Sequence, residues 1–187
     1  MERTALIIIF SVILIGVAGI AALVFLRKRK TERLRTRFGP EYARSVQESG
    51  SRRQGEAGLQ EREKRVEGFA IRPLAPTDRE RYIASWRKVQ AQFVDDPKSS
   101  VTEADRLLGD VMSTRGYSVS DFEQRSADIS VNHPLVVENY RAAHEIAVRH
   151  TRGQAGTEDL RQAMIHYRTL FDELVGEPEM ARAKAAS

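Results

Sequence analysis

The sequence has no cysteine, one tryptophan and only four histidines in 187 residues. Without cysteine the chain can form neither disulfide bridges nor thiolate metal sites, and it has no thiol nucleophile. The absence fits a reducing compartment without requiring one, because many exported domains also lack cysteine. Phosphate-binding glycine motifs and the GxSxG motif are absent as well, and His144-Glu145 is not followed by a second histidine at position 148. The sequence therefore carries no catalytic signature, and we predict no cofactor and no metal.

The sequence also lacks any stretch in which polar and apolar residues alternate for long enough to form a sheet. Apolar residues instead recur every three or four positions, the spacing that puts them on one face of a helix. The clearest such set is Leu160, Met164, Tyr167, Phe171 and Leu174. The predicted fold class is all-α, with about five helices between residues 77 and 175 packed as a small bundle.

Three segments have the pattern of a capping box, in which Ser or Thr at a helix start is followed three residues later by Glu. They are residues 77–80, 100–103 and 120–123. We also expect Thr157 to cap the last helix and Gly116 to follow the end of an earlier one. These patterns predict where the helices begin and end.

One stretch differs from all others in the chain. Residues 5–26, ALIIIFSVILIGVAGIAALVFL, contain no charged side chain and one polar side chain, Ser11. A helix of these 22 residues would cover about 33 Å, enough for a bilayer core of about 30 Å. The alternative is a cleaved signal peptide, which has a basic amino end and a shorter apolar core of about 7–15 residues. Residues 1–4 are nearly neutral and the apolar run is longer, so the sequence predicts a retained, single transmembrane helix.

Basic residues lie mainly on one side of this run. Arg3 precedes it, and seven basic residues follow it. They are Arg27, Lys28, Arg29, Lys30, Arg33, Arg35 and Arg37. Because basic residues beside a span stay in the cytoplasm, we expect the N-terminus outside and everything after Arg27 in the cytoplasm.

The same basic residues suggest two kinds of partner. Residues 27–53 hold ten basic and three acidic residues, a net charge of +7 in a chain of net +4. Anionic lipid headgroups attract basic residues beside a span by about 1 kcal/mol each, so we expect residues 27–37 to contact headgroups. Arg44, Arg52 and Arg53 should matter less, because the surface potential fades over a Debye length of about 8 Å. Nucleic acid is the disfavoured alternative, since no aromatic side chain stands among the first seven basic residues to stack on bases.

Composition divides the chain into five predicted parts. They are a short tail (1–4), the transmembrane helix (5–26), a basic, charged juxtamembrane stalk (27–68), a helical domain (69–176) and a flexible tail (177–187). Within the stalk, the Gly- and Ser-rich residues 49–58 suggest a flexible or poorly packed stretch. Residues 59–67 are dense in charge and suggest an exposed helix with little core of its own.

Only one set of side chains suggests chemistry. Asp121, Asp128, His133 and His144 would converge if the loop before residue 121 met the loop after residue 129, and together they could bind a metal or act as general bases. The structural alternative is that His133 hydrogen-bonds a helix end and that His144 is a half-buried side chain with its polar atoms satisfied. The sequence does not decide whether the four side chains meet.

Four segments of the chain resemble a known family. They are RYIASWRKVQAQFVDDP, EADRLLGDVMSTRGY, DFEQRSADISVNHPLVVENYRAAHEI and DLRQAMIHYRTLFDEL, and FGPEYARSV lies near the membrane. The chain is similar, over about residues 33–176, to a family of small, uncharacterised bacterial membrane proteins with one N-terminal span and a helical cytoplasmic-type domain. The resemblance implies a bacterial inner-membrane context, and it brings no activity, cofactor or catalytic residue.

The sequence favours a membrane-anchored helical domain that is a non-enzymatic protein-interaction or scaffold module. The first alternative is an enzyme or metal-binding domain that uses His133, His144 and nearby acids. The second alternative is a membrane-tethered nucleic-acid binder that uses residues 27–53. No protein partner is indicated by name.

Overall fold

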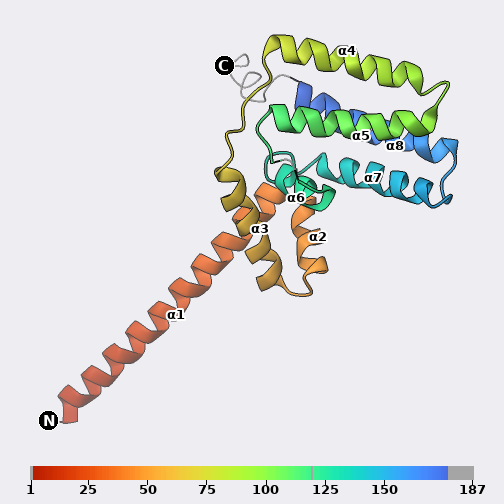
Figure 1. The fold of residues 1–187 in the computed structure, drawn as a ribbon. Coiled ribbons are helices and arrows are strands. Elements are labelled where there is room, and N and C mark those ends of the chain that lie inside the picture. Colours follow the sequence, from red (N-terminus) through yellow and green to blue (C-terminus); the bar gives the residue numbers. More distant parts are fainter. Residues whose placement is uncertain (1, 119, 177–187) are drawn as a thin grey trace. The chain divides into compact units, whose positions relative to one another are not determined.

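The structure is a computed structural model. All the regular secondary structure in the part of the chain that it describes is helical. That part comprises residues 2–118 and 120–176, with side chains described from Leu14 onward. The eight helices found there are α1 (Glu2–Phe38), α2 (Pro40–Glu48), α3 (Arg52–Glu67), α4 (Pro76–Gln92), α5 (Pro97–Thr114), α6 (Phe122–Asn132), α7 (Val137–Thr151) and α8 (Thr157–Val175) (Figure 1). The all-α prediction is confirmed.

The chain forms two compact units, one up to Glu56 and one from Ala57 onward. The division lies inside α3 and not at residues 68 and 69, where the stalk was predicted to meet the helical domain. Residues 2–4, predicted as a tail, belong to α1. The predicted flexible tail, 177–187, lies outside the described residues. Among the side chains that are described, no helix is long and apolar enough to cross a membrane.

The first unit is a long helix followed by a tight reversal of the chain. Gly39 has a φ of 50°, which a side chain would disfavour, and Pro40 occupies the first turn of α2. Leu34 and Phe38, one turn apart on α1, are fully buried, and Tyr42 on α2 is nearly so. Apolar burial therefore accompanies the reversal.

A shared carboxylate ties the three helices of this unit together. Glu56 Oε1, in the first turn of α3, accepts hydrogen bonds from Thr31 Oγ1 on α1 and from the Tyr42 hydroxyl on α2, both at 2.8 Å. Gly55 brings α3 close to α2, because a Cβ at this position would lie 2.8 Å from the Val46 Cα. The prediction of poor packing is wrong at Gly55, because this glycine permits close packing of two helices.

The rest of α3 also differs from its prediction. Leu59, Glu63 and Val66, spaced four and three residues apart, are all buried, so residues 59–67 do not form a merely exposed helix. Arg65 pairs with a residue of another helix, Asp128 on α6, with Nη2 2.7 Å from Oδ1.

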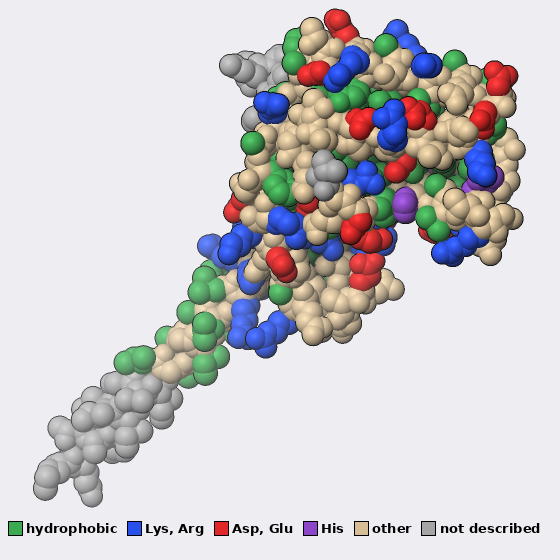
Figure 2. Space-filling model, viewed as in Figure 1, with side chains coloured by type: hydrophobic (Ala, Val, Ile, Leu, Met, Phe, Trp, Pro, Cys, Tyr) green, Lys and Arg blue, Asp and Glu red, His purple; other side chains and the backbone are tan. Residues whose placement is uncertain are grey.

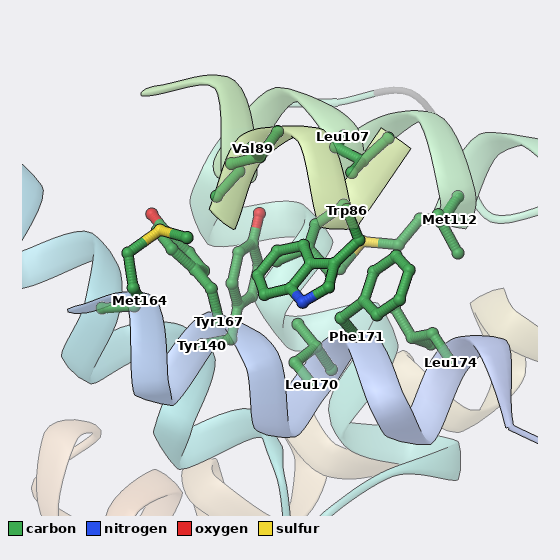
Figure 3. Close-up of a cluster of buried hydrophobic side chains, with 14 of the residues drawn as sticks. Trp86, Val89, Leu107, Met112, Tyr140, Met164, Tyr167, Leu170, Phe171 and Leu174 are labelled. Carbon is green, nitrogen blue, oxygen red and sulfur yellow. The ribbon is translucent and has the colours of Figure 1, made fainter. Parts of the chain in front are cut away.

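Helices α4 to α8 form the predicted five-helix bundle in the second unit. Helix α8 packs against α7 and α5, and α4 packs against α5 (Figure 1). The centre is a stack of apolar side chains from α4, α5, α7 and α8, in which Trp86, Leu170 and Phe171 lie together (Figure 3). The apolar face predicted on the last helix is buried at all five of its positions.

Helix starts were predicted less well than helix faces. Pro76 and Pro97 occupy the first turns of α4 and α5, so both helices begin before the predicted capping residues 77 and 100. Asp96 caps α5 by accepting from the Ser99 amide at 3.1 Å, and Asp121 caps α6 by accepting from the Gln124 amide at 2.8 Å. Ser120 and Thr157 are therefore not the capping residues either, since α8 begins after Gly156.

Two arginines donate hydrogen bonds to backbone carbonyls at the carboxyl end of α8. Arg115 Nη1 donates to the Leu174 carbonyl at 3.0 Å, and Arg79 Nε donates to the Val175 carbonyl at 2.9 Å. Positive side chains at this end complement the helix dipole. As predicted, Gly116 follows the end of α5, and its φ of 96° places it against the Ala70 carbonyl of the extended segment before α4.

Candidate functional site

The apolar part of α1 is exposed on every side over its described length. Its large hydrophobic side chains are each more than half exposed, at 54% to 72% of their full area. They are Leu14, Ile15, Val17, Ile20, Leu23, Val24, Phe25 and Leu26. Successive residues of a helix are 100° apart, so these positions surround the axis and do not form one stripe. A helix that is apolar all round belongs in a buried or membrane environment, whereas a single partner helix would need only one apolar face.

A ring of four cations follows this surface directly. Arg27, Lys28, Arg29 and Lys30 are all exposed, and four consecutive residues also surround a helix axis. We call these residues the basic ring. The guanidinium of Arg29 lies 4.6 Å from the centre of the Phe25 ring, which joins the last aromatic of the apolar part to the first turn of the basic part. Figure 2 shows the hydrophobic side chains along α1 giving way to Lys and Arg.

The structure separates the seven predicted headgroup contacts into two groups. The basic ring forms no ion pair with any side chain that the structure describes. Arg35, in contrast, pairs with Glu32 at 3.8 Å and lies 5.3 Å from the centre of the Tyr42 ring. Arg33 and Arg37 also have partners within the protein. The cations that remain available to an external anion are therefore concentrated in the ring.

The two aspartates of the predicted chemical cluster have structural roles. Asp121 is exposed and caps α6. Asp128 is 1% exposed, and its Oδ1 accepts from Arg65 Nε and from Gln124 Nε2, both at 2.8 Å. A buried carboxylate held by a guanidinium in this way fastens α3 to α6.

The two histidines lie in two further environments. Nδ1 of His133, at the end of α6, lies 3.0 Å from Glu173 Oε1 on α8. His144 is half-buried and stacks on Phe122, with ring centres 3.6 Å apart and planes 7° apart. Within the described residues, no three His, Asp or Glu side chains are close enough together to hold a metal ion. Each of the four predicted residues thus has its own surroundings in the part of the chain that the structure describes.

A polar centre that the sequence did not indicate lies among α5, α6 and α8, with its charged side chains partly exposed. Asp105 on α5 accepts from the Tyr167 hydroxyl at 3.2 Å, and its other oxygen is 3.8 Å from Arg125 Nη2 on α6. Gly109 leaves room for this arginine, since a Cβ there would lie 2.7 Å from Arg125 Nη1. Burial, reinforced by the Asp105 charge, raises the pKa of Tyr167 and of Tyr140. With one carboxylate and neutral phenols, this centre orients α5, α6, α7 and α8 and offers no metal-ligand set.

A shallow groove lies between α4 and α5 in the second unit. Two adjoining depressions of about 370 and 420 Å³ share Ser85, Glu103 and Arg106 in their walls. Arg106 pairs with Glu103 and Asp110 along α5, on one side of this groove, with its Nη1 3.0 Å from Asp110 Oδ2. The groove is therefore polar and balanced in charge, and it carries no catalytic arrangement.

Comparison with protein-family models, curated proteins and solved structures finds no match for the chain. The resemblance to small bacterial membrane proteins with one span therefore stays a prediction.

Proposed function

We propose that the protein is a single-pass membrane protein whose helical domain is a non-enzymatic interaction or scaffold module at the cytoplasmic face of a bacterial inner membrane. The observation that carries the proposal is the all-round exposure of the apolar side chains of α1 from Leu14 to Leu26, followed at once by the basic ring. The apolar run begins at Ala5 in the sequence, so the described side chains cover its second half.

The order of side chains along α1 supports a bilayer as the environment of this helix. Lipid tails favour apolar side chains in every direction around a spanning helix, and long basic side chains at its end reach the headgroups. A coiled-coil partner would instead favour an apolar stripe that repeats every seven residues, with polar residues elsewhere. The basic ring also favours the N-out orientation.

The second unit supports an interaction role more than catalysis. The side chains most suited to chemistry, Asp128, His133 and His144, have partners on neighbouring helices and are not gathered in one cleft. General acid–base or metal chemistry needs several such groups within reach of one substrate atom. The helix surfaces that remain exposed can bind another protein, and its identity is open.

Membrane extraction tests the anchor. The full chain should remain with the membrane fraction in alkaline carbonate and be released by detergent. Val17→Asp places a charge near the middle of the apolar run and should move the protein toward the carbonate-soluble fraction, since a central aspartate costs about 2.5–3.5 kcal/mol. Val17→Leu is the matched control and should behave as the unchanged chain does. Release of the unchanged chain by carbonate would refute the anchor.

Reporter fusions test the orientation separately. A reporter that works only in the cytoplasm should be active after Ser187, and a periplasmic phosphatase at the same position should be inactive. The reverse result would overturn the proposed topology and leave the anchor itself standing.

Crosslinking in whole cells tests the interaction role. Full-length chain carrying a photo-crosslinker at Lys88, which is exposed on α4, should form a discrete adduct with a protein partner. Turnover of a small-molecule substrate by the purified full chain, lost on His144→Gln, would favour the enzyme alternative instead.

A further inference from the structure

The reversal of the chain after α1 changes which basic residues lie near the basic ring. In the sequence, Arg52 follows Lys30 by 22 positions, which would be about 33 Å if the helix continued. In the structure, α1 ends at Phe38, α2 runs back from Gly39, and α3 begins at Arg52. Sequence distance therefore does not measure distance from the ring.

The Glu56 hydrogen bonds fix where the returning chain lies along α1. Thr31, which donates to Glu56 Oε1 at 2.8 Å, is the residue directly after the basic ring. Arg52 lies one helical turn before Glu56, or about 6 Å along α3, on the side of the α2–α3 connection. Figure 1 shows α2 running down from the end of α1, with this connection at the lower end of α2. The start of α3 thus lies beside the residue that follows the basic ring, near the level of the ring itself.

The two arginines at that start are available to an external anion. Arg52 and Arg53 are both exposed, and neither forms an ion pair with any residue in the described part of the chain. Arg44, on α2, differs because its Nε is 2.8 Å from Glu48 Oε1. Six cations, four on α1 and two on α3, are therefore unpaired at one level of the first unit.

We propose that Arg52 and Arg53 join the basic ring in a single surface that binds anionic phospholipid headgroups. This inference rests on the proposed membrane anchor and names the ligand of its basic end. Cations that surround a helix next to an apolar run match a plane of phosphates perpendicular to that helix. A nucleic acid strand would instead be matched by cations along one side. Under this proposal Arg52 and Arg53 contribute as much as the nearer residues, in contrast to the expectation from the sequence, because α2 returns the chain toward the basic ring.

Charge-removing pairs test the surface. The full chain is inserted into nanodiscs that contain phosphatidylglycerol and phosphatidylcholine, and the preference for the anionic lipid is measured with spin-labelled lipids. Arg52→Gln/Arg53→Gln should lower the preference as much as Lys28→Gln/Lys30→Gln does, by up to about fivefold for each residue. Arg87→Gln/Lys88→Gln removes two exposed cations from α4 and is the matched control, which should leave the preference unchanged.

A charge-retaining variant tests the role of the fold. Gly55→Leu places a side chain against the Val46 backbone and should push the start of α3 away from α2, so the lipid preference should fall with every charge still present. Gly58→Leu is the matched control, because a Cβ at Gly58 meets nothing within 4 Å. An unchanged preference in Gly55→Leu would overturn the role of the reversal.

Measurements of depth in the bilayer test whether the start of α3 lies near the headgroups. Because the chain has no cysteine, Gln54→Cys and Thr36→Cys each provide a unique labelling site, and both positions are exposed. A fluorophore at position 54 should be quenched by headgroup-labelled lipid more strongly than one at position 36, the reverse of their order in the sequence. Weaker quenching at position 54, or an Arg52→Gln/Arg53→Gln variant equal to the α4 control, would refute the proposal. If that variant lost DNA binding and kept its lipid preference, the surface would be a nucleic-acid site.

These outcomes are separable from failure of the anchor. Each variant is first checked for carbonate-resistant insertion, so a chain that never enters the membrane counts against the proposed function. A chain that inserts normally but shows no lipid preference counts against the six-cation surface alone.

Discussion

Trp86 stacks on Phe171 in the centre of the bundle, with ring centres 4.7 Å apart and planes inclined by 15°. The pair joins α4 to α8, and Trp86 is 4% exposed. Trp86→Ala should lower the free energy of unfolding by about 3–5 kcal/mol, since it removes a buried aromatic and leaves a cavity. Trp86→Phe keeps a ring against Phe171 and should cost less. Chemical denaturation of both variants measures the difference, and equal stability for Trp86→Ala and the unchanged chain would contradict this packing.

The pair of Arg65 with the buried Asp128 should matter more than an exposed ion pair. Arg65→Gln would leave the carboxylate of Asp128 buried without its guanidinium, at a cost of about 3–5 kcal/mol. Arg161→Gln breaks the pair with Glu158 on the surface of α8 and should cost much less, because water and salt screen exposed ion pairs. Urea unfolding of the two variants makes the comparison, and similar losses would mean that Asp128 finds another donor.

Gly116 should tolerate no side chain. Its φ of 96° disfavours one, and a Cβ would collide with the Ala70 carbonyl oxygen. Gly116→Ala should therefore lower the melting temperature clearly more than Gly153→Ala, where φ is 71° and a Cβ meets nothing within 4 Å. Gly153→Ala introduces backbone strain without a collision. The difference in melting temperature between the two variants therefore measures the cost of the collision at Gly116. No gap would show that the segment before α4 moves aside freely.

His144 should make the bundle less stable in mild acid. Burial lowers the pKa of this imidazole from its ordinary 6.5, and Arg125 lowers it further, while the charges of Asp105 and Glu123 act in the opposite direction. Because the folded-state pKa is below the unfolded value, the unfolded chain binds the proton first. The contribution of His144 to stability is therefore complete above about pH 6.5 and is lost as the pH falls toward the folded-state pKa.

Melting temperatures between pH 7.5 and pH 5 measure this effect. The unchanged chain should lose more stability over that range than His144→Phe, which keeps a ring against Phe122 and cannot bind a proton. Parallel curves for the two proteins would mean that His144 is as easily protonated in the fold as in the unfolded chain.

The sequence predicted the bundle well because each helix carries its own apolar face. Apolar residues recur every three or four positions from Leu160 to Leu174, and this pattern can be recognised without knowing which helices pack against it. The helix starts were harder because two kinds of capping compete locally. A proline at position 97 starts α5 early and gives the cap to Asp96, although Ser100 and Glu103 form a plausible box of their own.

The reversal in the first unit and the partners of the candidate residues could not be predicted in the same way. Gly55 has the same appearance in the sequence whether it breaks a helix or lets two helices touch. His133 meets Glu173 across 40 positions, and Arg65 meets Asp128 across 63, so neither pair leaves a local pattern. Such contacts depend on how the helices pack, and helix packing cannot be inferred from one sequence alone.

Helix α1 continues without interruption from the apolar run through the basic ring to Phe38. A continuous helix is stiff to twisting as well as to bending, because each turn is hydrogen-bonded to the next. Thr31 on α1 and Tyr42 on α2 both donate hydrogen bonds to Glu56, and these bonds hold the start of α3 against α1 and α2. If α1 turns about its own axis as a rigid body, Arg52 and Arg53 turn with it through the same angle.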